Sequence, residues 1–122
     1  MKQKLPERRR FVRVEVPLEV TVTTAGMSEK VVTKNISPVG MRFEIARPIK
    51  SEDKISMDLS LPSAGKTVKL DGKVVWQKKN SLEDDAPYDV GVEIMNIEEK
   101  NKNVFLKYLC DILYKSTYEE RT

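Results

Sequence analysis

The sequence of 122 residues predicts a mainly β domain: six short strands in an antiparallel barrel or sandwich, followed by one α-helix. Two observations support this fold class. Apolar residues occupy every second position in several short segments, and turns rich in Gly, Pro, Ser and Asn separate these segments. Beyond Asn96 the spacing of apolar residues changes from two to about 3.6, which is the period of a helix.

The alternation of apolar and polar residues defines the six predicted strands. They cover residues 13–23, 30–35, 41–45, 55–61, 68–76 and 88–94. Pro17 has no amide donor, so its part of the first strand should lie at an edge or a bulge. Gly72, in the middle of the fifth segment, predicts a bulge or a tight bend. Trp76 falls on an inward position of the same segment, and we expect it to pack in the core.

The C-terminal helix is predicted to begin after Asn96, which is a suitable N-cap residue. Its apolar side chains share one face: Val104, Phe105, Tyr108, Leu109, Ile112 and Leu113. This face must be buried, either against an open end or flank of the barrel or against the same helix of a second protomer. Cys110, within the helix, is expected to be a semi-buried thiol.

The composition excludes several classes of function. With 39% hydrophobic and 34% charged residues, the chain has the composition of a soluble protein, and it lacks the run of about 18 apolar residues that a membrane span needs. No signal-peptide pattern follows the basic N-terminus, so we expect a cytoplasmic location. Histidine is absent and Cys110 is the single cysteine, so no metal site is expected. Ser37 has no histidine base and no motif places a carboxylate pair, so we expect no catalytic residue, no cofactor and no enzyme activity.

Two polar motifs are the candidates for a binding site. The first, Arg9-Arg10-Phe11-Val12-Arg13, places arginines four positions apart just before the first strand. A guanidinium can form paired hydrogen bonds with a phosphate or with O6 and N7 of guanine. The second, Asn35-Ile36-Ser37-Pro38-Val39-Gly40, is predicted to be a polar loop. Asn35 and Ser37 offer neutral donors and acceptors, and Gly40 permits a positive φ and a close backbone approach. The same residues are common in turns, so this segment alone could be only a strand connection.

Taken together, the two motifs resemble the PilZ domain family, whose signature is RxxxR followed by [D/N]xSxxG. Arg9 and Arg13 match the first motif, and Asn35, Ser37 and Gly40 match the second. The resemblance implies a six-stranded antiparallel, split β-barrel with a C-terminal α-helix, and it implies a sensor of cyclic di-GMP. By the same resemblance, the two arginines contact phosphates and guanine edges, and the second motif holds a guanine from the barrel side.

The resemblance also sets the expected organisation of the chain. Residues 1–7 would be a flexible basic tail, residues 8–118 a single PilZ-like domain, and residues 119–122 a second tail. Arg8, directly before the first motif, would supply a further guanidinium for a second copy of the ligand. The ligand is expected to order the arginine segment and so to alter binding of an unidentified partner protein, in a pathway such as motility or exopolysaccharide regulation. The protein would be a monomer or a ligand-dependent dimer.

Two other functions are compatible with parts of the sequence. A PilZ-like adaptor would bind a partner through its sheet or helix and bind no nucleotide, but both motifs are intact, which argues against it. A small barrel could instead bind single-stranded nucleic acid through the basic N-terminal segment. Two features of the sequence argue against nucleic-acid binding. No series of aromatic residues interleaved with basic ones is visible, and several outward strand positions are acidic: Glu15, Glu19, Asp58 and Glu93.

Overall fold

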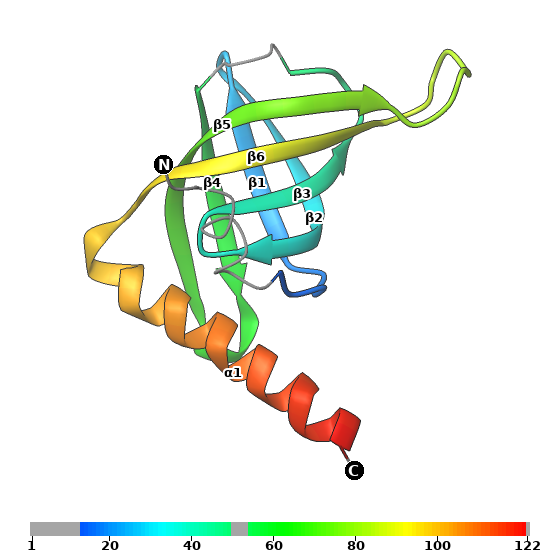
Figure 1. The fold of residues 1–122 in the computed structure, drawn as a ribbon. Helices are drawn as coiled ribbons and strands as arrows, with labels where there is room; N and C mark the ends of the chain where they lie inside the picture. The colour runs from blue at the N-terminus through cyan, green and yellow to red at the C-terminus, as the bar shows by residue number, and fades with distance from the viewer. Residues whose placement is uncertain (1–12, 50–53, 122) are drawn as a thin grey trace, which may run out of the picture.

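Six antiparallel strands close a barrel in the computed structural model, which describes residues 13–49 and 54–121 (Figure 1). The strands are β1 (Glu19–Thr24), β2 (Met27–Ser37), β3 (Gly40–Ile45), β4 (Lys54–Leu61), β5 (Lys66–Lys79) and β6 (Tyr88–Ile97). Short 3₁₀ turns, η2 (Pro62–Ala64) and η3 (Glu99–Asn101), follow β4 and β6, and the chain continues in α1 (Lys102–Arg121). The order around the barrel is β1-β2-β3-β6-β5-β4, and pairing of β1 with β4 closes it. The prediction of an antiparallel barrel with a C-terminal helix is confirmed.

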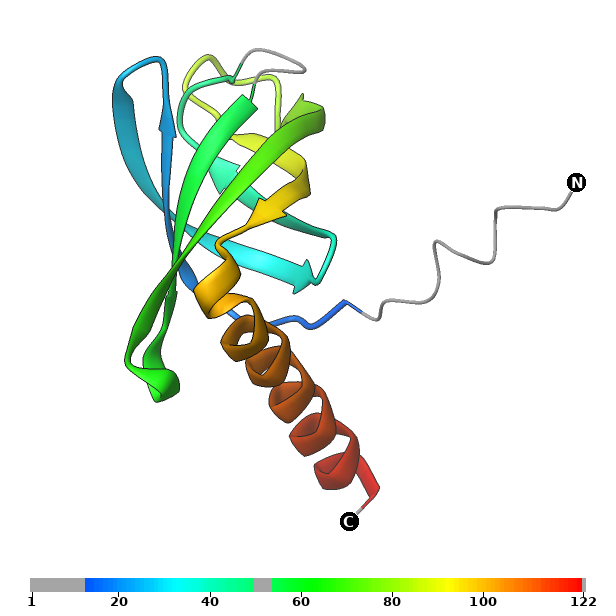
Figure 2. The same ribbon diagram turned by 90° about the vertical axis from the view of Figure 1, so that its left-hand side faces the viewer.

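One apolar core fills the barrel and continues under the helix. Alternate strand residues point inward and are almost completely buried, among them Val20, Val22, Ile36, Met41, Phe43, Met57, Leu59, Leu61, Val68 and Val74. In α1, Phe105 and Leu109 are buried in the same core, and Tyr108 and Ile112 pack against it. The predicted apolar face of the helix is therefore covered by the barrel of its own chain as far as Ile112, whereas Leu113 is exposed. The C-terminal half of α1 extends away from the strands (Figure 1, Figure 2).

The first strand is shorter than predicted. The ladder of β1 begins at Glu19, and the preceding segment, residues 13–18, is called the lead-in below. An isolated antiparallel β-bridge between Val14 and Ile36 attaches the lead-in to β2. Hydrogen bonds of Thr33 attach it at a second place. The Thr33 hydroxyl donates to the carbonyl of Val16 at 2.6 Å and accepts from the amide of Leu18 at 3.0 Å. Pro17, which is exposed, lies between these contacts, and its lack of an amide hydrogen explains why the ladder is interrupted here.

The second motif is not the loop that the sequence suggested. Asn35 and Ser37 belong to β2 and Gly40 begins β3, so only Pro38 and Val39 form the turn. Ser37 pairs with Gly40 across this hairpin.

The register between β5 and β6 shifts twice, and the sequence predicted an irregularity at the first of these places. The first shift is opposite Gly72, where Met95 of β6 is the extra residue, and the second lies between Val74 and Trp76 of β5. Val75 is the extra residue at the second shift, so Trp76 takes an outward position instead of an inward one. Its exposed fraction is 43%, and the prediction that Trp76 packs in the core is wrong.

The start of the helix also differs from the prediction. Asn96 is still part of β6, where it pairs with Asp71, and α1 begins six residues later at Lys102. The intervening turn is held by Glu98, whose side chain accepts a hydrogen bond from Nδ2 of Asn101 at 2.9 Å. Cys110 is exposed and not semi-buried, because one residue beyond Leu109 the helix has turned by about 100° away from the core.

Candidate functional site

Outward-facing residues of four neighbouring strands form a row across the barrel. Asn35 of β2 pairs with Arg42 of β3, Arg42 pairs with Gly91 of β6, and Gly91 pairs with Trp76 of β5. Directly paired residues in antiparallel strands share a face of the sheet, so these four positions, called the cross-strand row below, line up on the outside. A hollow of about 270 Å³ lies over the row, and Arg13 and Val75 also line it.

The indole of Trp76 lies across β6 because residue 91 has no side chain. A β-carbon at Gly91 would overlap the Nε1 and Cε2 atoms of the indole. On the far side of Gly91, the guanidinium carbon of Arg42 is 5.8 Å from the centroid of the indole ring, within the range of a cation–π interaction. Trp76, Gly91 and Arg42 therefore form one continuous surface.

Arg42 is held in place by a buried carboxylate. Its Nη2 donates to Oδ2 of Asp89 at 2.8 Å, and Asp89 is only 5% exposed. Lys34 donates to the other oxygen of Asp89 at 3.2 Å and pairs with Glu44 at 2.9 Å. The hydrogen bond from Arg42 is the main cause that lowers the pKa of Asp89 below its ordinary value, and the bond from Lys34 lowers the pKa of Glu44. The two cations and two carboxylates of this cluster balance in charge.

Two of the predicted site residues meet at one end of the row. Arg13 is exposed in the lead-in, and its Nη1 donates to Oδ1 of Asn35 at 2.7 Å. The two residues are 22 positions apart in the sequence and come from different motifs. Both line the hollow. Arg8 and Arg9 lie outside the described residues.

Ser37 and Gly40 lie in the wall of the barrel. Ser37 is 1% exposed, and its hydroxyl accepts a hydrogen bond from the amide of Val39 at 3.2 Å, which fixes the hairpin turn. Gly40 allows β3 and β6 to approach closely, because a β-carbon there would be 2.8 Å from the carbonyl oxygen of Val92. Gly40 provides the close approach, but it does not adopt the positive φ that a glycine permits: the glycines with positive φ in the described part of the chain are Gly26 and Gly65.

Arg42 and Trp76 were not predicted to belong to a site. The sequence could have indicated Arg42, since it occupies an outward position of a predicted strand close to the second motif. No feature of the sequence indicates Trp76, because the bulge at Val75 reverses the direction of its side chain and no glycine or proline marks that bulge.

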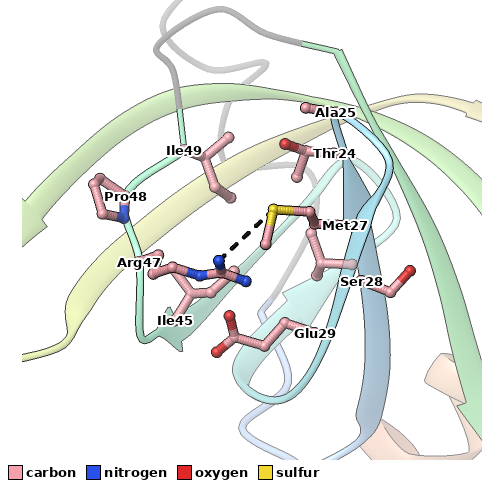
Figure 3. Close-up of a pocket in the computed structure, with 10 residues that line it drawn as sticks. Thr24, Ala25, Met27, Ser28, Glu29, Ile45, Arg47, Pro48 and Ile49 are labelled. Atoms are coloured by element: carbon pink, nitrogen blue, oxygen red, sulfur yellow. Dashed lines mark hydrogen bonds between the residues drawn. The ribbon is translucent and has the colours of Figure 1, made fainter.

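A second hollow, of about 230 Å³, lies at the opposite end of the barrel, between the β1–β2 hairpin and the segment after β3 (Figure 3). Met27, which is 50% exposed, lies beside Arg47, whose Nη1 is 3.7 Å from its sulfur. The carboxylate of Glu29 accepts a hydrogen bond from the amide of Ala46 in the same region. One arginine and one glutamate leave this hollow without the excess of cationic donors that a ligand with two phosphates requires.

The residues described by the structure contain no group of three or more His, Cys, Asp or Glu side chains placed to hold a metal ion. Among the same residues, no helix combines the length and the apolar character needed to cross a membrane.

The chain belongs to the PilZ domain family. The sequence profile described as "PilZ domain" matches residues 7–110, which is most of the chain. A search of curated protein sequences found no significant match.

Solved structures share the fold at low sequence identity. The PilZ domain of YcgR from Escherichia coli, solved with c-di-GMP, is 13% identical with a TM-score of 0.70, and the match covers 93% of this chain and 97% of that one. The inhibitor of motility MotI (DgrA) from Bacillus subtilis is 18% identical with a TM-score of 0.73, over 88% of this chain and 52% of that one. MrkH from K. pneumonia, in complex with c-di-GMP, is 16% identical with a TM-score of 0.73, over 92% and 55%. The chain thus spans about half the length of MotI and of MrkH.

Proposed function

We propose that this protein is a receptor for cyclic di-GMP and not an enzyme. The observation that carries the proposal is the 2.7 Å hydrogen bond between Arg13 and Asn35, which joins the two motifs at one end of the hollow. Membership of the PilZ family and the c-di-GMP present in the structures of E. coli YcgR and K. pneumonia MrkH support it.

In the proposed complex, the arginines recognise the charged part of the ligand. Arg8, Arg9 and Arg13 would donate to phosphate oxygens and to guanine O6 and N7, for which the planar guanidinium is suited. Asn35 would hydrogen-bond a guanine from the barrel side. Ser37 and Gly40 would shape the wall behind that base, Ser37 by fixing the hairpin turn and Gly40 by keeping β3 close to β6.

The same contacts suggest how the ligand acts as a signal. Fixing a backbone residue costs about 1–2 kcal/mol, and each charge-assisted hydrogen bond returns about 1.5–3 kcal/mol. Several arginine contacts can therefore offset the free-energy cost of ordering the segment from Arg8 to Arg13. The two contributions are similar in size, so binding would stay reversible. The ordered segment would then present a changed surface to a partner protein.

Isothermal titration calorimetry with cyclic di-GMP tests the proposal. We expect a dissociation constant in the micromolar range or below, and each of Arg9→Ala and Arg13→Ala should weaken binding roughly 30-fold, equivalent to about 2 kcal/mol. Arg47→Ala is the matched control, because Arg47 is an exposed arginine at the opposite end of the barrel. Unchanged affinity in both motif variants would reject this site.

Binding of single-stranded nucleic acid is the second candidate function. One observation in the structure supports it that the sequence did not provide. Trp76 is exposed beside Arg42, and an exposed aromatic next to a cation can stack a base. The cross-strand row offers one such aromatic, and the acidic side chains of Asp89 and Glu44 lie next to it. Binding of an oligonucleotide that weakens steeply with salt, with no heat from cyclic di-GMP, would support this candidate instead.

A further inference from the structure

The hollow between the β1–β2 hairpin and the segment after β3 differs in chemistry from the cross-strand row (Figure 3). Its volume of about 230 Å³ is below the roughly 300–1,000 Å³ of pockets for drug-sized ligands, so it suits a small molecule. The inner wall is apolar, because it is formed by core side chains that are 1–5% exposed: Val22, Ile45 and Ile49. A compact aliphatic group would be sheltered from water there.

Two side chains of opposite charge, Arg47 and Glu29, line the same hollow, and neither forms an ion pair within the described part of the chain. Nη1 of Arg47 donates to the sulfur of Met27 at 3.7 Å, and a thioether is a weak acceptor, so most donors of the guanidinium remain available. Oε2 of Glu29 accepts from the amide of Ala46 at 3.1 Å, and Oε1 remains available. The hollow therefore offers one cation and one anion beside an apolar wall.

The wall of the hollow is held in place by hydrogen bonds from two strands. The amide of Ile49 donates to Oε1 of Gln77 in β5 at 3.0 Å, and Nε2 of the same glutamine donates to the carbonyl of Ile49. The bond from the amide of Ala46 to Glu29 ties the other end of the segment to β2. Residues 46–49 are thus fixed at both ends, and a ligand would have little ordering cost to offset.

The turn between β1 and β2 provides a further observation. Ala25 and Gly26 have positive φ values of 51° and 79°, as both central residues of a type I′ turn require. This conformation is unfavourable for alanine, and Asn, Asp or Gly is the usual choice at its position. Ala25 lines the hollow, where its methyl group extends the apolar wall. A residue that is strained in the turn but contributes to the hollow points to a role in binding.

We propose that this hollow binds a free α-amino acid with an aliphatic side chain, such as leucine. The carboxylate of the ligand accepts paired hydrogen bonds from the guanidinium of Arg47, its ammonium group donates to Glu29, and its side chain packs against the apolar wall. A zwitterion without net charge matches a site with one charge of each sign. This site goes beyond the proposed receptor function and does not depend on it, since no residue lines both this hollow and the one over the cross-strand row.

Titration of the full chain with L-leucine, in the absence of cyclic di-GMP, tests the proposal by calorimetry and by two-dimensional ¹H–¹⁵N NMR. We expect a dissociation constant of about 0.1–1 mM, as suits so small a ligand, and the largest NMR shifts at the amides of Ala46 and Ile49. N-acetyl-L-leucine lacks the ammonium group and L-leucinamide lacks the carboxylate. Each of these derivatives should bind about 10- to 100-fold more weakly, because one charge-assisted hydrogen-bond pair is lost.

Substitutions in the hollow should reproduce these losses one charge at a time. Arg47→Ala should bind L-leucine no better than L-leucinamide, and Glu29→Gln, which retains an oxygen to accept from the amide of Ala46, should bind it no better than N-acetyl-L-leucine. Ala25→Asn should raise the thermal midpoint by about 4 °C and yet weaken binding, because it relieves the strained turn but replaces the methyl group with a polar amide. Lys30→Ala is the matched control, since Lys30 is an exposed cation next to Glu29 that does not line the hollow.

Circular dichroism should show that every variant is folded, and Lys30→Ala should bind L-leucine as the wild type does. Unshifted amides of Ala46 and Ile49 at about 10 mM L-leucine would overturn the proposal. Equal affinity of the wild type for L-leucine and both derivatives would overturn it as well, because the hollow would then recognise only an apolar side chain, such as that of a docked peptide. Neither result would affect the proposed receptor function, which is measured with cyclic di-GMP alone.

Discussion

Asp89 determines the geometry of the charged residues in the cross-strand row. It is buried, it bonds Arg42 and Lys34 through its two oxygens, and the hydrogen bond from Arg42 lowers its pKa. A carboxylate in this setting remains ionised at neutral pH and orients the guanidinium beside Trp76. The Nε atom of Arg42 is buried and has no hydrogen-bond partner, so Asp89 contributes most of what fixes this side chain.

Asp89→Asn should lower the free energy of unfolding at pH 7 by about 1 kcal/mol, a value kept small because both cations are partly exposed. The folded pKa is below the unfolded one, so ionised Asp89 stabilises the fold above the unfolded pKa of about 3.9, and this contribution is lost as the pH falls through the folded pKa. The difference between variant and wild type should therefore be largest near neutral pH and vanish in strong acid. Urea unfolding at several pH values measures it.

The surface pair between Lys69 and Asp58 provides the control for that experiment. Its N–O distance is also 3.2 Å, but the side chains are 70% and 42% exposed. Asp58→Asn should change stability by only a few tenths of a kcal/mol at any pH, because water screens an exposed pair. Equal effects of the two substitutions would contradict a special role for Asp89.

At the scale of single elements, α1 depends on a few buried side chains near its start. Phe105 is fully buried and Leu109 nearly so, whereas Leu113 is already at the surface. The helix is thus anchored by its first two turns, and the second half extends beyond the barrel (Figure 2). Most helical stability in proteins comes from such packing and not from intrinsic propensity.

Phe105→Ala should lower the free energy of unfolding by about 3–5 kcal/mol, because it removes a large side chain from the core and leaves a cavity. Thermal and urea unfolding should both show the loss. Cys110→Ala, in the same helix at an exposed position, should remain within about 0.5 kcal/mol of the wild type. A small effect of Phe105→Ala would mean that the helix contributes little to the core.

The elements also show where sequence reasoning succeeds and where it fails. The six strands, the helix and the register shift opposite Gly72 are predicted, because apolar periodicity and the glycine indicate them directly. The bulge at Val75 is not, since valine is an ordinary strand residue and only the register against β6 reveals that an extra residue is present. That single shift is the reason why the direction of Trp76 could not be read from the alternation.

The same distinction holds for the candidate site. The resemblance to PilZ domains brought Arg13 and Asn35 into one hypothesis, and the structure places them in contact. The cross-strand row required knowledge of which residues pair across β2, β3, β6 and β5, two of which are not consecutive in the sequence. Long-range register depends on closure of the whole barrel, and a local pattern does not contain it.

At the scale of the whole molecule, closure of the barrel limits how the protein can meet a partner. Each of the six strands is paired on both sides, so the described residues offer no open sheet edge for strand addition. Among the described residues, the β5–β6 hairpin and the second half of α1 extend beyond the barrel (Figure 1). Together with the lead-in, these parts are the candidates for passing a signal from the ligand to a partner.

The lead-in lies beside the helix, which makes α1 the better candidate. A hollow of about 380 Å³ is lined on one side by Arg13, Val14 and Glu15, and on the other by Ile112 and Leu113. Asn35 lines the same hollow. A ligand that repositions Arg13 would consequently change the surroundings of the helix at its fourth turn, where the anchoring by Phe105 and Leu109 has ended.

Hydrogen exchange followed by mass spectrometry tests this coupling. Saturating cyclic di-GMP should slow exchange in the lead-in and in α1 around Ile112, because ordering of Arg13 closes the hollow that the two segments share. The β1–β2 hairpin, at the opposite end of the barrel, should exchange at the same rate with and without ligand. Arg13→Ala should abolish the slowing in α1. Protection confined to the lead-in, with α1 unchanged, would mean that the helix does not sense the ligand and that the signal leaves through the ordered arginine segment alone.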